Sequence, residues 1–191
     1  HPPLVPLQTY LDLYQHISIN TPYLGKWTAS SEDATYSLRA NYNRGAKINT
    51  DQSLAIRRAF YALCTHIDHQ LRIVIGTLRE EGLLNNTIIC FTSDHGDMLG
   101  NHNMWAKRLF YEYSANIPMI LVGGSSDKQI GYNRVDDRLV GWQDVMPTLL
   151  DMANIDIPET VEGLSIVGNQ KRDWFYAEVG EDNHATRMIH D

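Results

Sequence analysis

The sequence predicts an α/β fold: part of a mainly parallel sheet flanked by helices, with a small antiparallel strand pair near the C-terminal end. Residues 52–81 repeat apolar side chains at spacings of three and four, which indicates an amphipathic helix against a core. Residues 88–91 form a continuous apolar run, typical of a strand covered on both faces. A helix followed by such a strand indicates a right-handed crossover. Residues 175–179 and 185–189 are predicted as the antiparallel pair.

Length, charge and hydropathy limit the class of protein. With 191 residues, 43% of them hydrophobic, the chain can bury one core. Its net charge of -7 argues against a nucleic-acid partner, because such partners are held by Lys and Arg contacts to phosphate. No run approaches about 18 consecutive apolar residues, so no transmembrane segment is predicted. Cys64 and Cys90 are expected to be buried free thiols, which favours a reducing, cytoplasmic compartment over a periplasmic or secreted one.

The first part of the chain is predicted to be largely irregular. It opens with His1, followed by two prolines, and has neither an initiator Met nor a signal-like region, as expected for the continuation of a longer protein. The prolines keep the backbone extended, and a short helical turn is predicted over residues 10–14. Residues 23–51 are polar and poor in aliphatic side chains, which predicts a long loop. Such loops are usually functional or mobile.

The helix predicted over residues 52–81 has clear ends. Thr50 or Asp51 can cap its start, and Gly82 suits the left-handed position that follows its last turn. His66 and His69 lie three positions apart on one face, a spacing that suits a metal. Because the core stripe flanks them and no further ligand follows at a helical spacing, a structural role is the favoured interpretation. The stripe consists of Ile56, Phe60, Leu63, Ile67, Leu71, Val74 and Leu78.

Further elements are predicted downstream, before a linker at residues 154–173 that contains one proline and two glycines. We therefore place a domain boundary at residue 153. The predicted elements are a helical turn at 110–114, a second buried strand at 119–122, a short strand starting at 139–140 and an amphipathic helix at 142–153 with Pro147 in its first turn.

The stretch richest in chemistry follows the strand predicted at residues 88–91. Asp94 and His95 stand where that strand ends, and ligands bind at the carboxyl ends of strands in open α/β sheets. Neighbouring residues of an extended chain point to opposite faces, but Gly96 is expected to adopt backbone angles that turn both side chains toward one point. A carboxylate beside an imidazole suits a divalent cation, and Lys107 can hold an anion against it.

An ordered series of motifs in this region resembles the sulfatase family of the alkaline-phosphatase-like superfamily. His95 stands where many sulfatases have Asn, which makes the chain more similar to the choline-sulfatase, iduronate-type and phosphonate monoester hydrolase branch. The resemblance implies that residues 1–153 are the C-terminal half of the catalytic α/β domain and that residues 154–191 start the C-terminal subdomain. The motifs are Phe91-Thr92-Ser93-Asp94-His95-Gly96, Gly100-Asn101-His102, Trp105-Ala106-Lys107, Tyr111-Glu112 and Ile117-Pro118-Met119-Ile120.

The resemblance also implies roles for individual residues. Asp94 and His95 would be metal ligands, with a capping carboxylate and an ordinary histidine as the alternative. Lys107 would bind the sulfate, and His1 would contact the sulfate or the leaving oxygen as a general acid. His102 would either orient a ligand or fill the turn. The metal would be Ca²⁺, with Mg²⁺ or Mn²⁺ as alternatives, and the substrate a small-molecule or sugar sulfate ester.

Two further positions bear on the site. Asp97 is expected to accept hydrogen bonds from turn amides rather than to bind the metal. The loop at residues 23–51 would shape the substrate pocket, where Trp27, Tyr36 and Arg39 either line the pocket or pack as ordinary loop residues. A homo-oligomer is compatible with the sequence.

The family's nucleophile motif is absent from this sequence. That motif is a Cys or Ser followed by x-Pro-x-Arg and converted to formylglycine, and the N-terminal pair of metal-binding Asp residues is absent as well. Asp94 and His95 offer two ligands where a hard cation takes six or more. The chain is therefore expected to be a fragment of a formylglycine sulfatase. The alternatives are a phosphonate monoester or phosphodiester hydrolase of the same superfamily and a non-catalytic binding domain.

Overall fold

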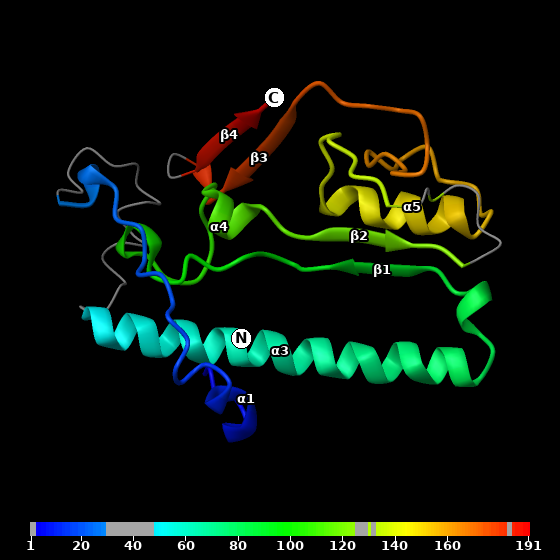
Figure 1. Cartoon of the computed structure of the whole chain (residues 1–191). Helices are drawn as coiled ribbons and strands as arrows, with labels where there is room; N and C mark the ends of the chain where they lie inside the picture. The colour runs from blue at the N-terminus through cyan, green and yellow to red at the C-terminus, as the bar shows by residue number, and fades with distance from the viewer. Residues whose placement is uncertain (1–2, 30–47, 125–129, 131–132, 183–184) are drawn as a thin grey trace.

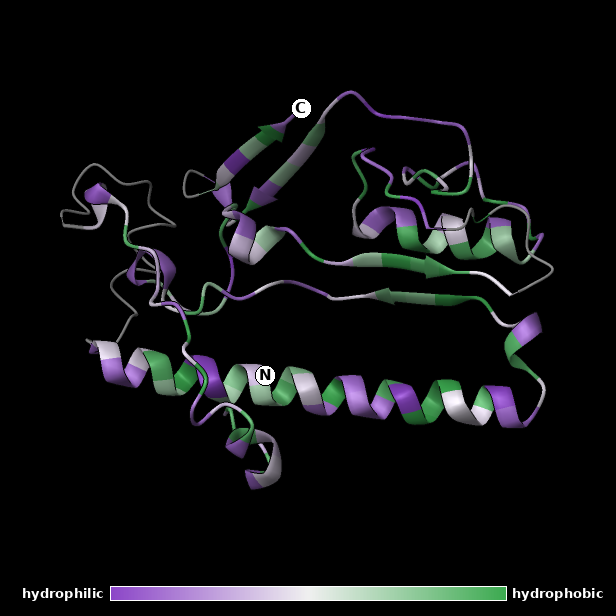
Figure 2. Cartoon of the chain, in the orientation of Figure 1, coloured by the Kyte–Doolittle hydropathy of each residue, from purple (hydrophilic) through white to green (hydrophobic). Residues whose placement is uncertain are grey.

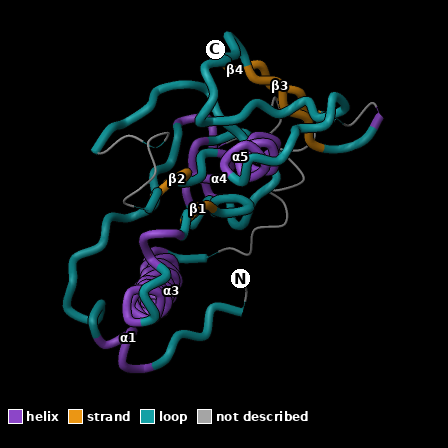
Figure 3. Tube along the Cα trace, turned by 90° about the vertical axis from the view of Figure 1, so that its right-hand side faces the viewer, coloured by secondary structure: helices purple, strands orange, loops and turns teal. Residues whose placement is uncertain are grey.

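The computed structural model describes residues 3–29, 48–124, 130, 133–182 and 185–191. Short 3₁₀ turns lie at Lys26–Ala29, Leu84–Asn86, Asn101–Asn103 and Trp142–Asp144. The helices and strands are α1 (Gln8–Asp12), α3 (Thr50–Glu80), β1 (Ile89–Thr92), α4 (Glu112–Ala115), β2 (Met119–Val122), α5 (Val145–Met152), β3 (Phe175–Val179) and β4 (Thr186–His190) (Figure 1). The ribbon of β1 and β2 lies between α3 and α5 (Figures 1 and 3).

The N-cap of helix α3 is Asn49, one residue before the predicted caps. The Asn49 side chain accepts a hydrogen bond from the Gln52 amide at 2.9 Å, and the Gln52 side chain accepts one from the Asn49 amide at 3.0 Å. This reciprocal capping box satisfies two amides at once, which explains why Asn49 rather than Thr50 or Asp51 caps the helix. At the other end Gly82 is left-handed with φ 69°, as predicted.

The two described strand pairs are both antiparallel, whereas the sequence predicted a mainly parallel sheet. Ile89 lies opposite Val122 and Thr92 opposite Met119 in the β1–β2 pair, and β3 pairs with β4. A parallel pair needs a crossover, usually through a helix. Residues 93–118 hold short turns and the four-residue α4, so the chain reverses instead. The short strand predicted at residues 139–140 is not formed.

The buried core of the described residues is small. Fully or nearly buried apolar side chains are Ala62, Met98, Met104 and Leu109. By contrast, Val74 on α3 is 56% exposed and Ile120 on β2 is 51% exposed. The strand β1 is half-buried rather than covered on both faces. Figure 2 shows that β1 and β2 are nonetheless strongly apolar.

Neither cysteine is buried. Cys64 is exposed and Cys90 is half-buried, so the expectation of two buried thiols is wrong. The physical reason is that the described residues leave much of α3 and the β1–β2 ribbon uncovered. Within these residues no helix is both long and apolar enough to cross a membrane.

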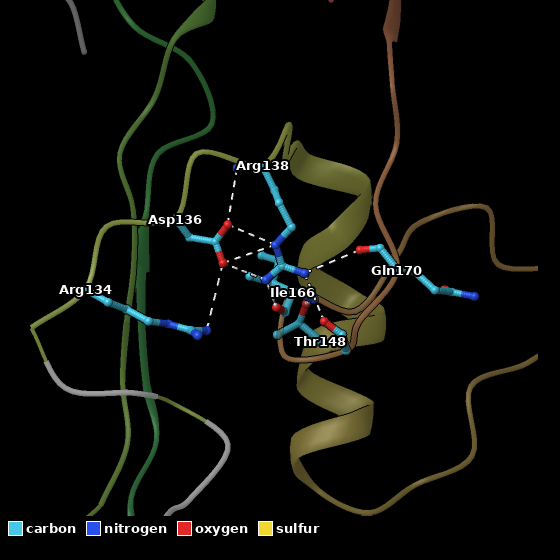
Figure 4. Close-up of polar contacts among 7 residues, drawn as sticks. Arg134, Asp136, Arg138, Thr148, Ile166 and Gln170 are labelled. Carbon is cyan, nitrogen blue, oxygen red and sulfur yellow. Dashed lines mark hydrogen bonds and ion pairs between the residues drawn. The ribbon is translucent and has the colours of Figure 1, made fainter.

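The segment that follows α5 is held against the chain by Arg138. Its guanidinium donates hydrogen bonds to the carbonyl oxygens of Ile166 at 2.6 Å and Gly168 at 2.9 Å (Figure 4). It also bonds both carboxylate oxygens of Asp136, at 2.7 Å for the shortest contact. One side chain therefore ties residues 166–168 to the loop that precedes α5.

The Asp136–Arg138 contact predicts a pH-dependent contribution to stability. Hydrogen bonds from Arg138 hold the pKa of Asp136 at about 2. Because the folded pKa is lowered, the contribution is complete above the ordinary value of 3.8 and is lost as pH falls through about 2. With the carboxylate one-third exposed, we expect Asp136→Asn to cost no more than about 1 kcal/mol at neutral pH. Urea unfolding at several pH values measures this cost.

The neighbouring Asp137→Asn is the matched control, since Asp137 is exposed and shares the same loop. We expect its effect to be near zero at every pH. A cost of Asp136→Asn that stays constant down to about pH 2 would contradict the assignment of the contact as the source of the stability.

Candidate functional site

Asp94 and His95 lie just beyond the end of β1, and their side chains meet. His95 Nε2 is 3.2 Å from Asp94 Oδ2. His95 Nδ1 is 2.7 Å from the Gly96 carbonyl oxygen, which can only accept a hydrogen bond, so Nδ1 carries a proton. In the neutral ring Nε2 then presents a lone pair to a carboxylate. Two acceptor atoms at this distance leave room for a positive charge between them.

The Asp94 carboxylate is fixed on one side and open on the other. Its Oδ1 accepts a hydrogen bond from the His95 amide at 2.9 Å, and Ser93 Oγ donates to the His95 carbonyl at 2.9 Å. Desolvation alone would raise the pKa of Asp94, but the hydrogen bond from the His95 amide and the charge of His95 outweigh it and lower that pKa. The side chain is 74% exposed. Asp94 is therefore an ionised carboxylate that faces solvent, with Oδ2 directed at His95 Nε2.

Gly96 is required here for a reason that differs from the predicted one. The sequence predicted unusual backbone angles, but Gly96 is not among the residues with positive φ. Its amide instead donates to the Ser114 carbonyl at 2.9 Å, and a Cβ at Gly96 would lie 2.2 Å from the Tyr113 carbonyl oxygen. Close approach of two backbone segments, not conformational freedom, excludes a side chain.

We expect Gly96→Ala to destabilise the fold by about 2 kcal/mol or more, because one backbone segment has to move to admit the methyl group. Chemical denaturation measures the effect. Gly76→Ala is the matched control, since nothing lies within 4 Å of a Cβ there and alanine favours a helix over glycine by up to about 1 kcal/mol. Equal effects of the two substitutions would rule out the close approach as the reason for Gly96.

The loop of residues 97–108 is closed by Asp97, as predicted. The Asp97 carboxylate accepts hydrogen bonds from the amides of Leu99 at 2.9 Å and Ala106 at 3.2 Å. The Met98 amide donates to the Ala106 carbonyl at 2.8 Å. Arg57 from α3 adds a hydrogen bond to the Leu99 carbonyl at 3.0 Å. Because Ala106 is bonded to Asp97 and Met98, its neighbour Lys107 is returned to the start of the loop.

Several residues of this loop have left-handed backbone conformations. Each such conformation costs a non-glycine residue about 1 kcal/mol or more, so it persists where the surroundings fix it. Backbone strain of this kind clusters at functional sites. The surroundings here are the hydrogen bonds just described and a buried core of Met98, Met104 and Leu109. The left-handed residues are Leu99, Gly100, His102, Asn103, Ala106 and Arg108.

His102 is buried among aromatic rings. The rings of Tyr23, Trp27 and Tyr111 lie 5.3, 5.2 and 4.7 Å from its ring. Its Nδ1 accepts a hydrogen bond from the Gly25 amide at 3.3 Å, and burial lowers its pKa, which keeps the ring neutral. These contacts join residues 23–27 to the loop. Such contacts are those of a residue that fills the turn, one of its two predicted roles, and its role in orienting a ligand stays a prediction.

The remaining predicted residues divide into two groups. His1, Tyr36 and Arg39 lie outside the described residues. His66 and His69 are covered by Tyr10 of α1, whose ring lies 4.8 and 5.3 Å from theirs, in agreement with a structural role. Among the residues that the structure describes, no three His, Cys, Asp or Glu side chains gather as a metal site. Asp94 and His95 are therefore a pair that no third such side chain joins within the described residues.

Trp142 is a contact of this site that no sequence pattern indicated. Its indole Nε1–H donates a hydrogen bond to the Ser93 carbonyl at 2.8 Å, across 49 positions of the chain. It follows Gly141 at the start of the segment that leads into α5. A single tryptophan in a helical pattern is indistinguishable from an ordinary packing residue, so the sequence carried no signal for it.

The fold and the site together define an α/β protein in which a carboxylate and an imidazole meet just beyond a strand end. The family model described as Sulfatase matches residues 16–155, and the chain belongs to the sulfatase family. An arylsulfatase of Clostridium perfringens (strain 13 / Type A) is 38% identical over 199 residues, covering 96% of this chain and 40% of that protein. A choline-sulfatase of Rhizobium meliloti (strain 1021) is 30% identical over 173 residues, covering 87% of this chain and 33% of that protein.

Solved structures share the fold of this chain. A phosphonate monoester hydrolase from Silicibacter pomeroyi matches all of this chain with a TM-score of 0.87 and 21% identity, over 44% of its own length. A protein solved with its substrate D-glucosamine-2-N,6-O-disulfate matches with a TM-score of 0.78 and 20% identity, over 52% of its length. The chain thus spans about half or less of the proteins it resembles, and both of these structures match it over its whole length.

Proposed function

We propose that this chain is the C-terminal part of a sulfatase that hydrolyses sulfate monoesters with the help of a divalent cation. The observation that carries the proposal is the Asp94–His95 pair, whose ligand atoms lie 3.2 Å apart at a strand end. Two neighbouring ligands of one Ca²⁺, each about 2.4 Å from the ion, would lie roughly 3.4 Å apart. The donor pair therefore fits adjacent positions on a cation.

The cation proposed is Ca²⁺, with Mg²⁺ or Mn²⁺ as alternatives. When bound, it would supply positive charge to the sulfate oxygens and to the charge that develops in the transition state. Asp94 and His95 would hold it. Lys107, carried on the loop that Asp97 closes, would bind a sulfate oxygen. His1 would donate a proton to the leaving oxygen.

The rest of the site would come from polypeptide beyond these 191 residues. We propose that it supplies the formylglycine nucleophile and the further carboxylate ligands that a hard cation needs. Two observations support this. The chain matches 40% of the length of the Clostridium arylsulfatase, and its strand β2 and helix α3 expose apolar side chains such as Ile120 and Val74. Exposed apolar surface of this kind indicates contact with more protein.

A second reaction of the same scaffold remains a candidate. The phosphonate monoester hydrolase with a TM-score of 0.87 matches the entire chain, and such enzymes would need the same cation and the same lysine. A non-catalytic sulfatase-like binding domain is disfavoured, because Asp94 and His95 keep a geometry suited to a ligand.

The decisive experiment uses the full-length polypeptide that contains this chain. It should hydrolyse p-nitrophenyl sulfate faster than the matched phosphonate monoester and phosphodiester, and Lys107→Ala should remove that activity. The adjacent Arg108→Ala is the control, because Arg108 is exposed. Faster turnover of the phosphonate would establish the second candidate. Lack of turnover on all three substrates would favour a binding domain.

A further inference from the structure

We propose that Trp142 is a positioning residue for the candidate cation site: its indole N–H holds the Ser93 carbonyl and thereby fixes the peptide that carries Asp94. The inference rests on the proposed function for its consequence in catalysis. The contact itself stands on geometry, with Nε1 2.8 Å from the Ser93 oxygen.

The position of Ser93 explains why such a contact is needed. The strand β1 ends at Thr92, whose partner on β2 is Met119, so Ser93 is the first residue beyond the ladder. Its carbonyl would otherwise depend on solvent for a hydrogen bond. The next peptide unit carries Asp94, so the direction of the Ser93 carbonyl sets the direction of the Asp94 side chain. Trp142 donates a hydrogen bond to the first carbonyl that follows the end of the strand pairing.

The indole is itself anchored from the other side. The Gly141 amide donates to the Asp144 carboxylate at 2.8 Å, and a Cβ at Gly141 would lie 2.3 Å from the Phe175 ring. Asp144 is completely buried and bonded to Arg172 at 2.7 Å. The turn that bears Trp142 is therefore clamped by a buried ion pair. The backbone from which the Trp142 side chain extends is therefore fixed, although the side chain itself is 51% exposed.

Ser93, which accepts the hydrogen bond, is itself hydrogen-bonded to the proposed ligand residues. Ser93 Oγ donates to the His95 carbonyl at 2.9 Å, and the His95 amide donates to Asp94 Oδ1 at 2.9 Å. Fixing Ser93 therefore restricts both ligand residues together. Groups that orient metal ligands typically change metal affinity by ten-fold or more when they are removed.

The test compares Trp142→Phe with Trp174→Phe in the full-length protein. Phenylalanine keeps an aromatic ring and removes the N–H donor. Trp174, which immediately precedes β3, is a matched control with 59% exposure. Hydrogen–deuterium exchange of the segment at residues 93–98 is the primary measurement. We expect exchange to accelerate at least about three-fold in Trp142→Phe and to stay unchanged in Trp174→Phe.

A purely structural role would accelerate exchange in α3 as well, so the helix at residues 50–80 is the internal reference. We further expect the Kd for Ca²⁺ to rise about ten-fold and kcat to fall, with the KM for the sulfate ester little changed. Unchanged exchange at residues 93–98 would overturn the inference, whatever the protein binds. Absence of cation binding in the unsubstituted protein would instead refute the proposed function. The exchange rates at residues 93–98 would still test the hydrogen bond between Trp142 and Ser93.

If Trp142→Phe does not fold, the hydrogen bond can still be tested in the protein with its natural sequence. The Trp142 indole N–H should exchange with solvent more slowly than that of Trp174, although the two side chains are similarly exposed. Equal exchange rates of the two indole protons, resolved by nuclear magnetic resonance, would show that the hydrogen bond to Ser93 is not formed.

Discussion

Asp94→Asn in the full-length protein is expected to lower kcat/KM for a sulfate ester by at least about 10³-fold. Asparagine keeps the shape of the side chain but removes the negative charge that faces His95 Nε2 at 3.2 Å. The proposed cation between these two side chains would then lose the stronger of its two ligands. Steady-state kinetics with p-nitrophenyl sulfate, together with calorimetric titration of Ca²⁺, measure the loss of activity and of binding.

Asp156→Asn makes the same chemical change on an exposed loop after α5 and serves as the control. It should leave both measurements unchanged. Because Asp94 is 74% exposed, the stability of the fold should hardly change, so a loss of activity in Asp94→Asn is not explained by unfolding. Wild-type turnover in Asp94→Asn would remove Asp94 from the proposed set of metal ligands.

Arg172→Ala is expected to cost about 3–5 kcal/mol of unfolding free energy. Asp144 has no exposed surface, and both of its oxygens are bonded by the Arg172 guanidinium, at 2.5 and 2.7 Å. Removing the arginine leaves a buried carboxylate with the amides of Gly141 and Leu164 as its remaining donors. Urea unfolding at neutral pH measures the cost.

The pH dependence gives a second signature of the same pair. Burial alone would raise the pKa of Asp144, but the hydrogen bonds from Arg172 and from the two amides lower it. The ion pair therefore contributes fully above the ordinary carboxylate value of 3.8, and the contribution is lost as pH falls below it. In Arg172→Ala burial would dominate and raise that pKa, so the variant should become more stable as pH is lowered from neutral.

Two further variants separate the ion pair from the loss of a long side chain. Lys171→Ala removes a neighbouring exposed cation and should cost little. The double variant Asp144→Asn with Arg172→Ala should be less destabilised than the sum of the single variants, because it contains no unpaired buried charge. Additive effects would mean that the two side chains contribute independently, contrary to the bidentate contact.

The sequence by itself determined the features that depend on neighbouring residues. The apolar period of three and four predicted α3, and the glycine after its last turn predicted the left-handed stop at Gly82. The order of motifs around Asp94 predicted the family, which the match to residues 16–155 confirms. Asp97 was predicted as an acceptor for turn amides because its neighbours in the chain supply them. Periodicity, capping and turn formation depend on residues close in the sequence, so they can be predicted from a single sequence.

The tertiary structure decided what depends on segments far apart in the chain. It made the β1–β2 pair antiparallel, since the direction of a strand depends on how residues 93–118 bring the chain back. It showed that Gly96 is needed because the Tyr113 carbonyl lies against it, which no backbone preference of Gly96 reveals. It brought Trp142 to Ser93 across 49 positions. These features follow from packing between distant segments, whose distances and directions are set only when the whole chain is folded.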